Sequence, residues 1–574
     1  MVLRKNMEKI QSDVLIIGSG GAGAMAAYEC SKYGIKVIVV NKGKLGHSGC
    51  TIMAPGGMAG VDKRWSKSED SIQQHFLDTL QAGLLINNQK LVALMVKRAA
   101  RVILELENMG ALWEKDKSGE KYLLRAGGGH SHARSVYLED HIGREIIRVL
   151  LNELQKKKVH LFEDTIILKI ITEEDGIRGA IGFDLRNFNF VIFESSTIIL
   201  ATGGAGQIYS NTDNPMDITG DGFRLALNAG VSLIDMEFVQ FYPLGFLYPP
   251  SLRGTLAGML YYSHLLNSNH ERFMEKYDQE KMELSTRDKV CQAIFHEVMK
   301  GKGTEHGGVF CDMTYLQKGF IAEKIPNFNR LYLSIGINPE KDLLEVAPTA
   351  HFFMGGVLVN QDWETELPGL FGAGEVCGGV HGGNRLSQNA LTDALVSGKI
   401  AGRKAVEVAL KRNKKTIHSS EIPEEENKIN KIFERKKNMN INPSSIRWEL
   451  QKLMWENVGI IRTKTKLSQS LKKIRQLKEK LKNTEIKSKI KLYNRELLLA
   501  LENESLLQTA ECTCMAALAR TESRGAHYRS DYPTQDDEKW LKNIILKKIK
   551  NEIQIDLKEV IFNKYSYKKL KNKN

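Results

Sequence analysis

One segment near the N-terminus, DVLIIGSGGAGAMAAYECSKYGIKVIVVNKG, constrains the fold more than any other part of the sequence. Val14–Ile17 and Val37–Val40 are short, fully apolar runs of the kind that form buried parallel strands. Residues 24–32, between them, have the composition of a helix. A strand, a glycine-rich turn, a helix and a second strand in this order predict a βαβ unit, and therefore an α/β fold with a parallel sheet.

The turn of this unit has the spacing G-x-G-x-x-G at Gly18, Gly20 and Gly23. In a dinucleotide-binding turn the first glycine permits the bend, and the second lets backbone amides approach a pyrophosphate. The third lets the helix pack closely on the strand. Asn41 and Lys42 stand where such folds often place an acid for the ribose hydroxyls. The choice of dinucleotide is therefore open from this unit alone.

Two later segments repeat the pattern of a strand followed by a glycine-rich turn. They are STIILATGGAGQIY at residues 196–209 and GLFGAGEVCGG at residues 369–379. Between them, FYPLGFLYPPSLRG interrupts the alternation of strands and helices. We therefore expect one nucleotide-binding domain assembled from residues 1–241 and 348–420, with a second domain inserted at residues 242–347.

The rest of the chain differs in composition. Residues 421–539 are charged, with apolar residues at helical spacing, and predict a helical domain. A coiled coil is the weaker alternative because the spacing is not a sustained heptad. Residues 540–574 are expected to form a basic tail, in which NEIQIDLKEVIF alternates like a strand. Ten Lys against three acidic residues in 542–574 supply half of the net charge of +14. Without a nucleic-acid motif, this charge indicates a solvated face and no nucleic-acid partner.

Composition sets the broad class of protein. A chain of 574 residues should fold as two or more domains. We find no apolar run long enough to span a membrane and no signal peptide. Seven scattered cysteines are typical of reduced thiols in the cytoplasm. The pair Cys512 and Cys514 lacks the spacing of a metal site, so no metal is expected. Any membrane association would be made through partner subunits.

Six segments, spread over nearly the whole chain, together resemble one family. They resemble the flavoprotein subunits of succinate dehydrogenase and fumarate reductase, with L-aspartate oxidase as a close relative. The resemblance implies a Rossmann-like FAD-binding domain, an inserted and mobile α+β capping domain, and a C-terminal helical domain. The segments are IIGSGGAGAMAA, ATGGAGQIYSNTDNPMDITGDGFRLALNAG, DMEFVQFYP, PTAHFFMGGV, GLFGAGEVCGGVHGGNRL and TAECTCMAALARTESRGAHYRSDYPTQDDEKWL.

The resemblance implies FAD as the cofactor. It places the adenine end on the glycine-rich turn and Lys42, and the ribityl and flavin end on Glu375 and the turn at Asn389. In physical terms, a helix N-terminus neutralises phosphate charge and carboxylates accept hydrogen bonds from sugar hydroxyls. The residues expected to bind FAD are Gly18, Gly20, Gly21, Ala22, Gly23, Asn41, Lys42, Ser48, Gly49, Cys50, Thr51, Gly56, Gly57, Ala201, Thr202, Gly203, Asp221, Glu375, Arg385, Asn389, Ala390 and Leu391.

The loop GHSGCTIMAPGG corresponds to the family's loop across the flavin ring. Respiratory members have HTVAAQGG here, with a histidine covalently joined to FAD. Counting back from Gly56 and Gly57, Cys50 occupies that position and His47 lies three residues earlier. We therefore expect non-covalent FAD. A cysteinyl link at Cys50 is the first alternative, and a link through His47 is the second.

The resemblance also assigns the chemistry. Arg385 and His351 would bind one carboxylate of a dicarboxylate, since a guanidinium pairs with a carboxylate through two hydrogen bonds. Arg287 would donate or accept the proton, and Tyr242 and Thr255 would contact the substrate. Each residue type also has a merely structural interpretation. In isolation His351 would be a core histidine, and Arg287 with Asp288 a surface ion pair.

Three departures from the family pattern alter the other half of the site. Tyr242 replaces a histidine that normally contacts the second carboxylate. Leu256 replaces a glutamate and Met259 replaces an arginine of the proton relay, and neither new side chain can transfer a proton. We expect either a substrate with a different distal group or a slower, rerouted proton supply on fumarate.

Three functions remain open from the sequence. The first is a fumarate reductase or succinate dehydrogenase flavoprotein subunit that exchanges electrons with a separate iron–sulfur partner, because this chain has no cysteine cluster for such centres. The second is an L-aspartate oxidase, which the segment GGGHSHARSVY at residues 127–137 resembles somewhat. The third is a flavin electron-transfer subunit whose site accepts a non-standard carboxylate or has decayed.

Overall fold

A five-stranded parallel sheet holds the centre of the molecule in the computed structural model, which describes residues 8–258, 260–412, 417, 422–434, 441–550 and 552–571. The strand order is β17-β10-β2-β3-β6, so segments far apart in the sequence become neighbours. Every pair in this sheet is parallel, as the βαβ pattern predicts. The strands are β2 (Val14–Ile17), β3 (Val37–Val40), β6 (His160–Phe162), β10 (Ile198–Leu200) and β17 (Leu370–Gly372).

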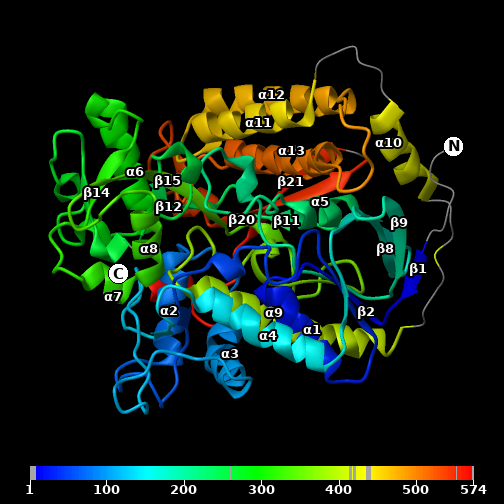
Figure 1. The fold of residues 1–574 in the computed structure, drawn as a ribbon, viewed down its shortest axis with the longest axis horizontal. Helices are drawn as coiled ribbons and strands as arrows, with labels where there is room; N and C mark the ends of the chain where they lie inside the picture. Colours follow the sequence, from blue (N-terminus) through cyan, green and yellow to red (C-terminus); the bar gives the residue numbers. More distant parts are fainter. Residues whose placement is uncertain are drawn as a thin grey trace.

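Helix α1 (Gly21–Ser31) packs on this sheet and against α4 (Ile142–Lys156) and α9 (Asn389–Ala409). Helix α9 lies close to α1 because two α9 residues at the contact, Gly398 and Gly402, are glycines. A Cβ at Gly398 would lie 2.3 Å from the Ala22 carbonyl oxygen. The first turn of α1 begins inside the glycine-rich turn, at Gly21 rather than at residue 24 as expected. Figure 1 shows α1, α3, α4 and α9 gathered on one side of the molecule. Helices α2 (Ile72–Ala82) and α3 (Gln89–Asn108) extend this layer.

A mostly antiparallel sheet, in the order β1-β9-β8-β7, lies beside the central sheet. Strand β7 follows directly after β6, which joins the two sheets in sequence. A short two-stranded pair, β4 and β5, lies in the loops before α2 and α4. The strands are β1 (Glu8–Gln11), β7 (Thr165–Glu173), β8 (Gly176–Asp184), β9 (Asn189–Glu194), β4 (Met58–Ala59) and β5 (Ser135–Val136).

Residues 242–346 contain a hydrophobic cluster of their own. It packs around an antiparallel sheet in the order β12-β15-β14-β13. These elements are green and lie at one end of the molecule in Figure 1. They are β12 (Val239–Phe246), β13 (His264–Leu266), α6 (Arg287–Glu297), β14 (Val309–Asp312), α7 (Phe320–Lys324), α8 (Pro326–Ser334) and β15 (Leu344–Phe353).

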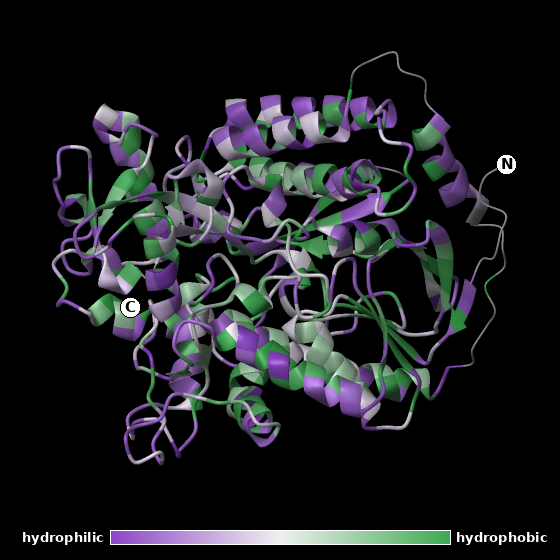
Figure 2. Cartoon of the chain, in the orientation of Figure 1, coloured by the Kyte–Doolittle hydropathy of each residue, from purple (hydrophilic) through white to green (hydrophobic). Residues whose placement is uncertain are grey.

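The predicted C-terminal helices form a layer on the opposite side from α1. Helices α11, α12 and α13 pack on one another, and α13 also packs on α5 (Asp221–Asn228). Figure 2 shows hydrophilic residues along α12 and more apolar ones along α13, which lies deeper. None of the described helices is long and apolar enough to cross a membrane. The helices are α10 (Ile422–Glu434), α11 (Pro443–Val458), α12 (Lys464–Lys482) and α13 (Arg495–Ala519).

The C-terminal segment is integrated into the fold. Strand β20 (Lys542–Ile549) pairs with β11 (Leu233–Ile234) on one side and with β21 (Glu552–Glu559) on the other. The alternating pattern in NEIQIDLKEVIF therefore does form a strand, and its neighbour β20 is largely buried. The remaining elements are β16 (Gly356–Val357), β18 (Ile461–Arg462), β19 (Tyr528–Arg529), α14 (Asp537–Trp540) and α15 (Tyr567–Lys571).

Candidate functional site

A cavity of ≈ 1430 Å³ opens at the carboxyl ends of β2, β3 and β10. Ligands in open α/β sheets bind at this end of the strands. The cavity continues past the flavin loop (residues 46–57) to the segment 242–347, and Arg287, His351 and Arg385 line its wall there. One connected space thus joins the predicted cofactor residues to the predicted catalytic residues.

The glycine-rich turn has the geometry that its spacing predicts. Gly18 has a φ of +105°, and a Cβ there would lie 2.3 Å from the Ala201 carbonyl oxygen. A Cβ at Gly23 would lie 2.0 Å from the Gly18 carbonyl oxygen, so this residue serves the packing of helix on strand and does not line the cavity. Gly20 is the N-cap of α1 and has no side chain to cap the helix. The Thr51 hydroxyl accepts from one first-turn amide, that of Gly21, and the positive end of the helix faces the cavity, where it favours an anion.

Lys42 and Asp221 form the next part of the wall. The Lys42 Nζ donates to Asp221 Oδ2 at 2.8 Å and contacts Glu502 Oε1 of α13 at 2.7 Å. Burial would lower the pKa of Lys42, but the two carboxylates outweigh it and raise this pKa above its ordinary value. Asp221 Oδ1 is buried without a partner among the described residues. Asn41, on the same wall, donates to Ser48 Oγ at 2.7 Å.

The flavin loop is fastened to the start of α1, because Gly21 N donates to Thr51 Oγ1 at 3.0 Å. Cys50 lines the cavity and is half-buried, whereas His47 is not part of the wall. Burial raises the pKa of the Cys50 thiol well above its usual range. Ser48, Gly49, Thr51, Gly56 and Gly57 line the cavity as expected.

The remaining predicted cofactor residues lie in the wall, with one exception. Burial raises the pKa of Glu375 to about 7, and its Oε1 accepts from Phe353 N at 3.0 Å. Asn389 lies behind the wall: it is fully buried and its Oδ1 is 2.8 Å from His75 Nε2. Asn389 is the first residue of α9, and its buried side chain fixes this helix start, from which Ala390 and Leu391 line the cavity. The wall residues of this part are Ala201, Thr202, Gly203, Gly20, Gly21, Ala22, Ala390 and Leu391.

These residues fit FAD on chemical grounds. The site pairs a helix N-terminus that begins in a glycine-rich turn with a large cavity, which suits a pyrophosphate joined to two ring systems. Several buried polar atoms in the wall have no partner among the described residues, as expected where a polar ligand supplies it. They are Ser19 Oγ, Thr202 Oγ1, Asp221 Oδ1, Arg385 Nε and Gln388 Oε1.

At the other end of the cavity, one neutral side chain holds two arginines. Gln240 Oε1 accepts from Arg287 Nη1 at 3.0 Å and from Arg385 Nη2 at 2.8 Å. Neither arginine has a carboxylate within ion-pair distance among the described residues, and Arg287 forms no ion pair with Asp288. Burial lowers the pKa of both, and the charge of Arg287 lowers that of Arg385 further. Arg385 is buried and Arg287 half-buried, and two such cations without an acidic partner at ion-pair distance among the described residues make a receptor for a carboxylate.

His351 lies beside this pair. Its Nδ1 is 2.5 Å from Asp213 Oδ2, which leaves Nε2 for a ligand. Burial lowers the pKa of His351 against the opposing effect of Asp213. A carboxylate arriving at Nε2 would favour the imidazolium, which donates from both nitrogens. Sequence reasoning missed Asp213 and Gln240, because a lone acid in a turn and a lone amide in a strand form no pattern.

The structure describes two of the three positions at which the sequence departs from the family pattern, Tyr242 and Leu256. The Tyr242 hydroxyl donates to the Gly258 carbonyl at 3.1 Å and accepts from Leu260 N at 3.1 Å, so Tyr242 presents its ring to the cavity. Leu256 lines the cavity, and Met259 lies outside the described residues. Thr255 is not in the wall: its amide donates to the Leu252 carbonyl, which closes a turn, and its carbonyl accepts from Phe246 N of β12.

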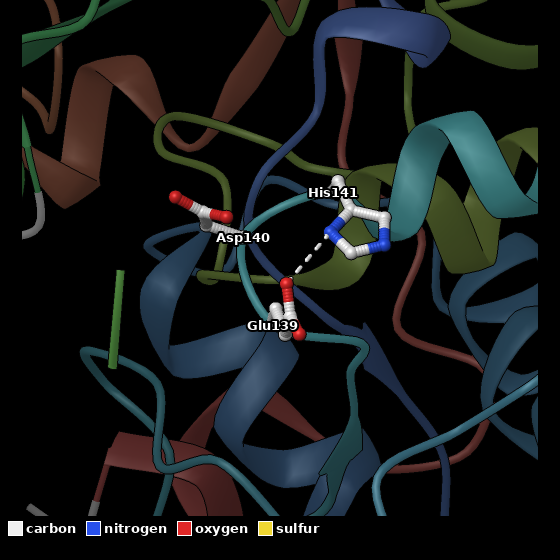
Figure 3. Close-up of side chains that lie close together, drawn as sticks. All are labelled: Glu139, Asp140 and His141. Carbon is white, nitrogen blue, oxygen red and sulfur yellow. Dashed lines mark ion pairs between the residues drawn. The ribbon is translucent and has the colours of Figure 1, made fainter. Parts of the chain in front are cut away.

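Glu139, Asp140 and His141 form a compact group of two carboxylates and an imidazole, and Glu139 of this group lines the cavity (Figure 3). The side chains of this group already bind one another or neighbouring backbone amides. Glu139 lies 3.4 Å from His141 Nδ1, and Asp140, which points away from that pair in the figure, accepts from Asn327 N and Phe328 N. The Asp140 carboxylate therefore caps the start of α8.

Known proteins resemble this chain over nearly its whole length. Family models match for the FAD binding domain at residues 13–391 and the fumarate reductase flavoprotein C-term at residues 447–573. A fumarate reductase (CoM/CoB) chain of Methanothermobacter marburgensis is 42% identical, covering 94% of this chain and 97% of that protein. The succinate dehydrogenase flavoprotein subunit of Rickettsia conorii is 31% identical, covering 93% and 92%. A variant of E. coli quinol fumarate reductase FrdA matches with a TM-score of 0.91 at 30% identity, covering 98% of each chain.

The fold and the cavity define an FAD-dependent oxidoreductase. More closely, the chain belongs to the family of fumarate reductase and succinate dehydrogenase flavoprotein subunits. The predicted family, fold class and cofactor are confirmed.

Proposed function

We propose that this chain interconverts a fumarate-like alkene and its succinate-like product as the flavoprotein subunit of a larger enzyme. The observation that supports this most is the pair of arginines in the cavity wall, Arg287 and Arg385, which are held on Gln240 without an acidic partner among the described residues. The names of the relatives, fumarate reductase and succinate dehydrogenase, agree with it.

The residues have separate roles in this reaction. Bound FAD supplies the hydride that one alkene carbon receives, or takes it back in the reverse direction. Arg385 and His351 bind one carboxylate, and Arg287 gives the neighbouring carbon its proton. Arginine is a weak acid in water. Burial makes Arg287 a better proton donor, because it disfavours the charged form.

The assignment of Arg287 is tested by fumarate reduction with a reduced viologen dye. We expect Arg287→Ala to lower kcat by about 10²–10⁴-fold with FAD content unchanged, because a positioned general acid contributes that much. Arg253→Ala is the matched control, since Arg253 is exposed and outside the cavity wall. If the wild-type protein reduces no fumarate and oxidises no succinate or close analogue, the dicarboxylate assignment is wrong.

L-aspartate oxidation remains the alternative that the segment at residues 127–137 favours. In the structure, His130 of this segment lines the cavity and its Nε2 is 2.6 Å from the Ser387 carbonyl oxygen. Burial lowers its pKa to about 4, so it is neutral near pH 7. Turnover of L-aspartate with oxygen, without a partner protein, would favour this function. Flavin reduction by a partner protein but by no dicarboxylate would favour the electron-transfer subunit.

We further propose that residues 242–347 form the capping domain and that an iron–sulfur subunit exchanges electrons with the flavin. The separate hydrophobic cluster of residues 242–346 supports the first proposal. The second is supported by the cysteines: all seven are free and none belongs to a metal-ligand group among the described residues.

A further inference from the structure

A third arginine in the cavity wall has no acidic partner. Arg125 is 8% exposed, and no carboxylate of the described residues lies within ion-pair distance of it. Its Nη1 donates to the carbonyls of Gly56 at 3.2 Å and Pro55 at 3.4 Å, and its Nη2 donates to the Glu139 carbonyl at 3.1 Å. A guanidinium has five N–H donors, so part of the fork is left for a ligand. The Tyr137 ring lies 4.1 Å from the Arg125 Cζ and supports it from one face.

A tyrosine near this arginine has an unused hydroxyl. Tyr261 lines the same cavity, and its hydroxyl oxygen is buried without a hydrogen-bond partner among the described residues. Burial raises the pKa of Tyr261, and the charge of Arg125 opposes this effect. Tyr261 in turn contributes to the pKa of Arg287. Tyr261 therefore lies within electrostatic range of Arg125 and Arg287.

Tyr242 connects this region to the carboxylate receptor formed by the two other arginines. Its ring lies 4.9 Å from the Arg287 guanidinium and 5.5 Å from the His351 ring. Its hydroxyl, at the other end, is bound by the segment that leads to Tyr261. Tyr261 therefore follows the segment at the hydroxyl end of Tyr242, whereas His351 lies beside the Tyr242 ring. The four residues after Arg125, one alanine and three glycines, also line the cavity and carry no charge.

We propose that Arg125 and Tyr261 bind the second anionic group of the substrate, at the end opposite Arg385 and His351. This inference rests on the proposed function, because it requires a substrate with two anionic ends. Bracing the flavin loop accounts for two of the Arg125 hydrogen bonds, those to Pro55 and Gly56, and the third goes to Glu139. Bracing does not account for a buried tyrosine hydroxyl left without a partner among the described residues in the same cavity wall, whereas an anion accepts hydrogen bonds from both groups.

The test compares two probes on the oxidised holoenzyme by isothermal titration calorimetry. Fumarate has two carboxylates, and monomethyl fumarate has one of them replaced by a neutral ester. The variants are Tyr261→Phe, which removes only the hydroxyl, and Arg125→Gln. Tyr315→Phe is the control, because Tyr315 is exposed and outside the cavity. FAD content and thermal unfolding of each variant report folding.

We expect both variants to weaken fumarate binding by about 10- to 100-fold, as for loss of a hydrogen bond to a charged group. Monomethyl fumarate binding should stay within about twofold, because its ester does not engage a cation strongly. Equal losses for the two probes, no loss in either variant, or a wild-type protein with no preference for fumarate would each overturn the subsite.

Failure of the proposed subsite and failure of the proposed reaction give different results in these experiments. A wild-type protein that binds fumarate through Arg125 and Tyr261 but never reduces it would refute the proposed reaction and leave the subsite standing. A protein that reduces fumarate but loses both probes equally in the two variants would do the reverse.

Discussion

At the residue scale, the site depends on a neutral side chain that holds two like charges together. Gln240 accepts from both Arg287 and Arg385 through one oxygen and donates to the Arg385 carbonyl at 2.9 Å. Because an amide has no net charge, it orients the guanidinium groups without neutralising them. A carboxylate at this position would fill the receptor that the substrate is proposed to occupy.

The mode of FAD attachment is also decided by single residues. The Cys50 thiol is half-buried with a raised pKa, so it is a poor nucleophile, and His47 is outside the cavity wall. We expect acid precipitation to release all of the flavin, giving a yellow supernatant, and Cys50→Ser to bind FAD as the wild-type protein does. A yellow pellet from the wild type that turns colourless in Cys50→Ser would instead establish a cysteinyl flavin.

Sequence reasoning found residues whose role follows from local geometry. Gly18 and Gly23 were predictable because the spacing of a glycine turn determines both the bend and the helix packing. Glu502 was not, although it pairs with Lys42, because it arrives from a helix more than four hundred residues later. Contacts of this kind are a property of the fold and leave no pattern around either residue.

At the scale of elements, strand bounds were the most predictable feature. The structure places β2 and β3 at the predicted residues, since a short apolar run between breakers has few alternatives. The pairing of β20 with β11 was not foreseen, because a lysine-rich strand resembles a solvated tail until its buried partner is known.

Helix α8 belongs to the segment 242–347, but its first turn is capped by Asp140, which lies outside that segment. Asp140 accepts from the amides of Asn327 at 3.0 Å and Phe328 at 3.1 Å, in the first turn of α8. We expect Asp140→Ala to destabilise this turn by about 1 kcal/mol, the usual effect of losing a helix cap. Amide hydrogen exchange at residues 327–330 should accelerate about fivefold or more as a result.

Glu139→Gln is the matched control for this experiment, because Glu139 is exposed and pairs with His141 rather than with α8. Unchanged exchange in Asp140→Ala, or equal acceleration in both variants, would contradict a capping role for Asp140.

At the scale of the whole molecule, the proposed function requires a separate protein that exchanges electrons with the flavin. We expect the tagged chain, purified gently from its native host, to bring down a protein that contains iron and acid-labile sulfide in stoichiometric amount. The physical reason is that this chain has no cysteine group to hold such centres itself among the described residues. The Arg287→Ala variant should retain the partner, since that side chain faces the cavity. Isolation of a lone chain that oxidises L-aspartate would argue for the alternative.

The strand order also determines when, during synthesis, the cofactor site can exist. Strand β10 lies between β2 and β17, so the central sheet is incomplete until the ribosome has passed residue 372. Strand β11 pairs with β16 and with β20, and β20 is translated more than three hundred residues after β11. Until β17 and β20 are made, β10 and β11 in the nascent chain each have an unpaired edge, and unpaired strand edges are what chaperones protect. The supply of FAD therefore matters only after residues 373–394, which complete the cavity wall, have been synthesised.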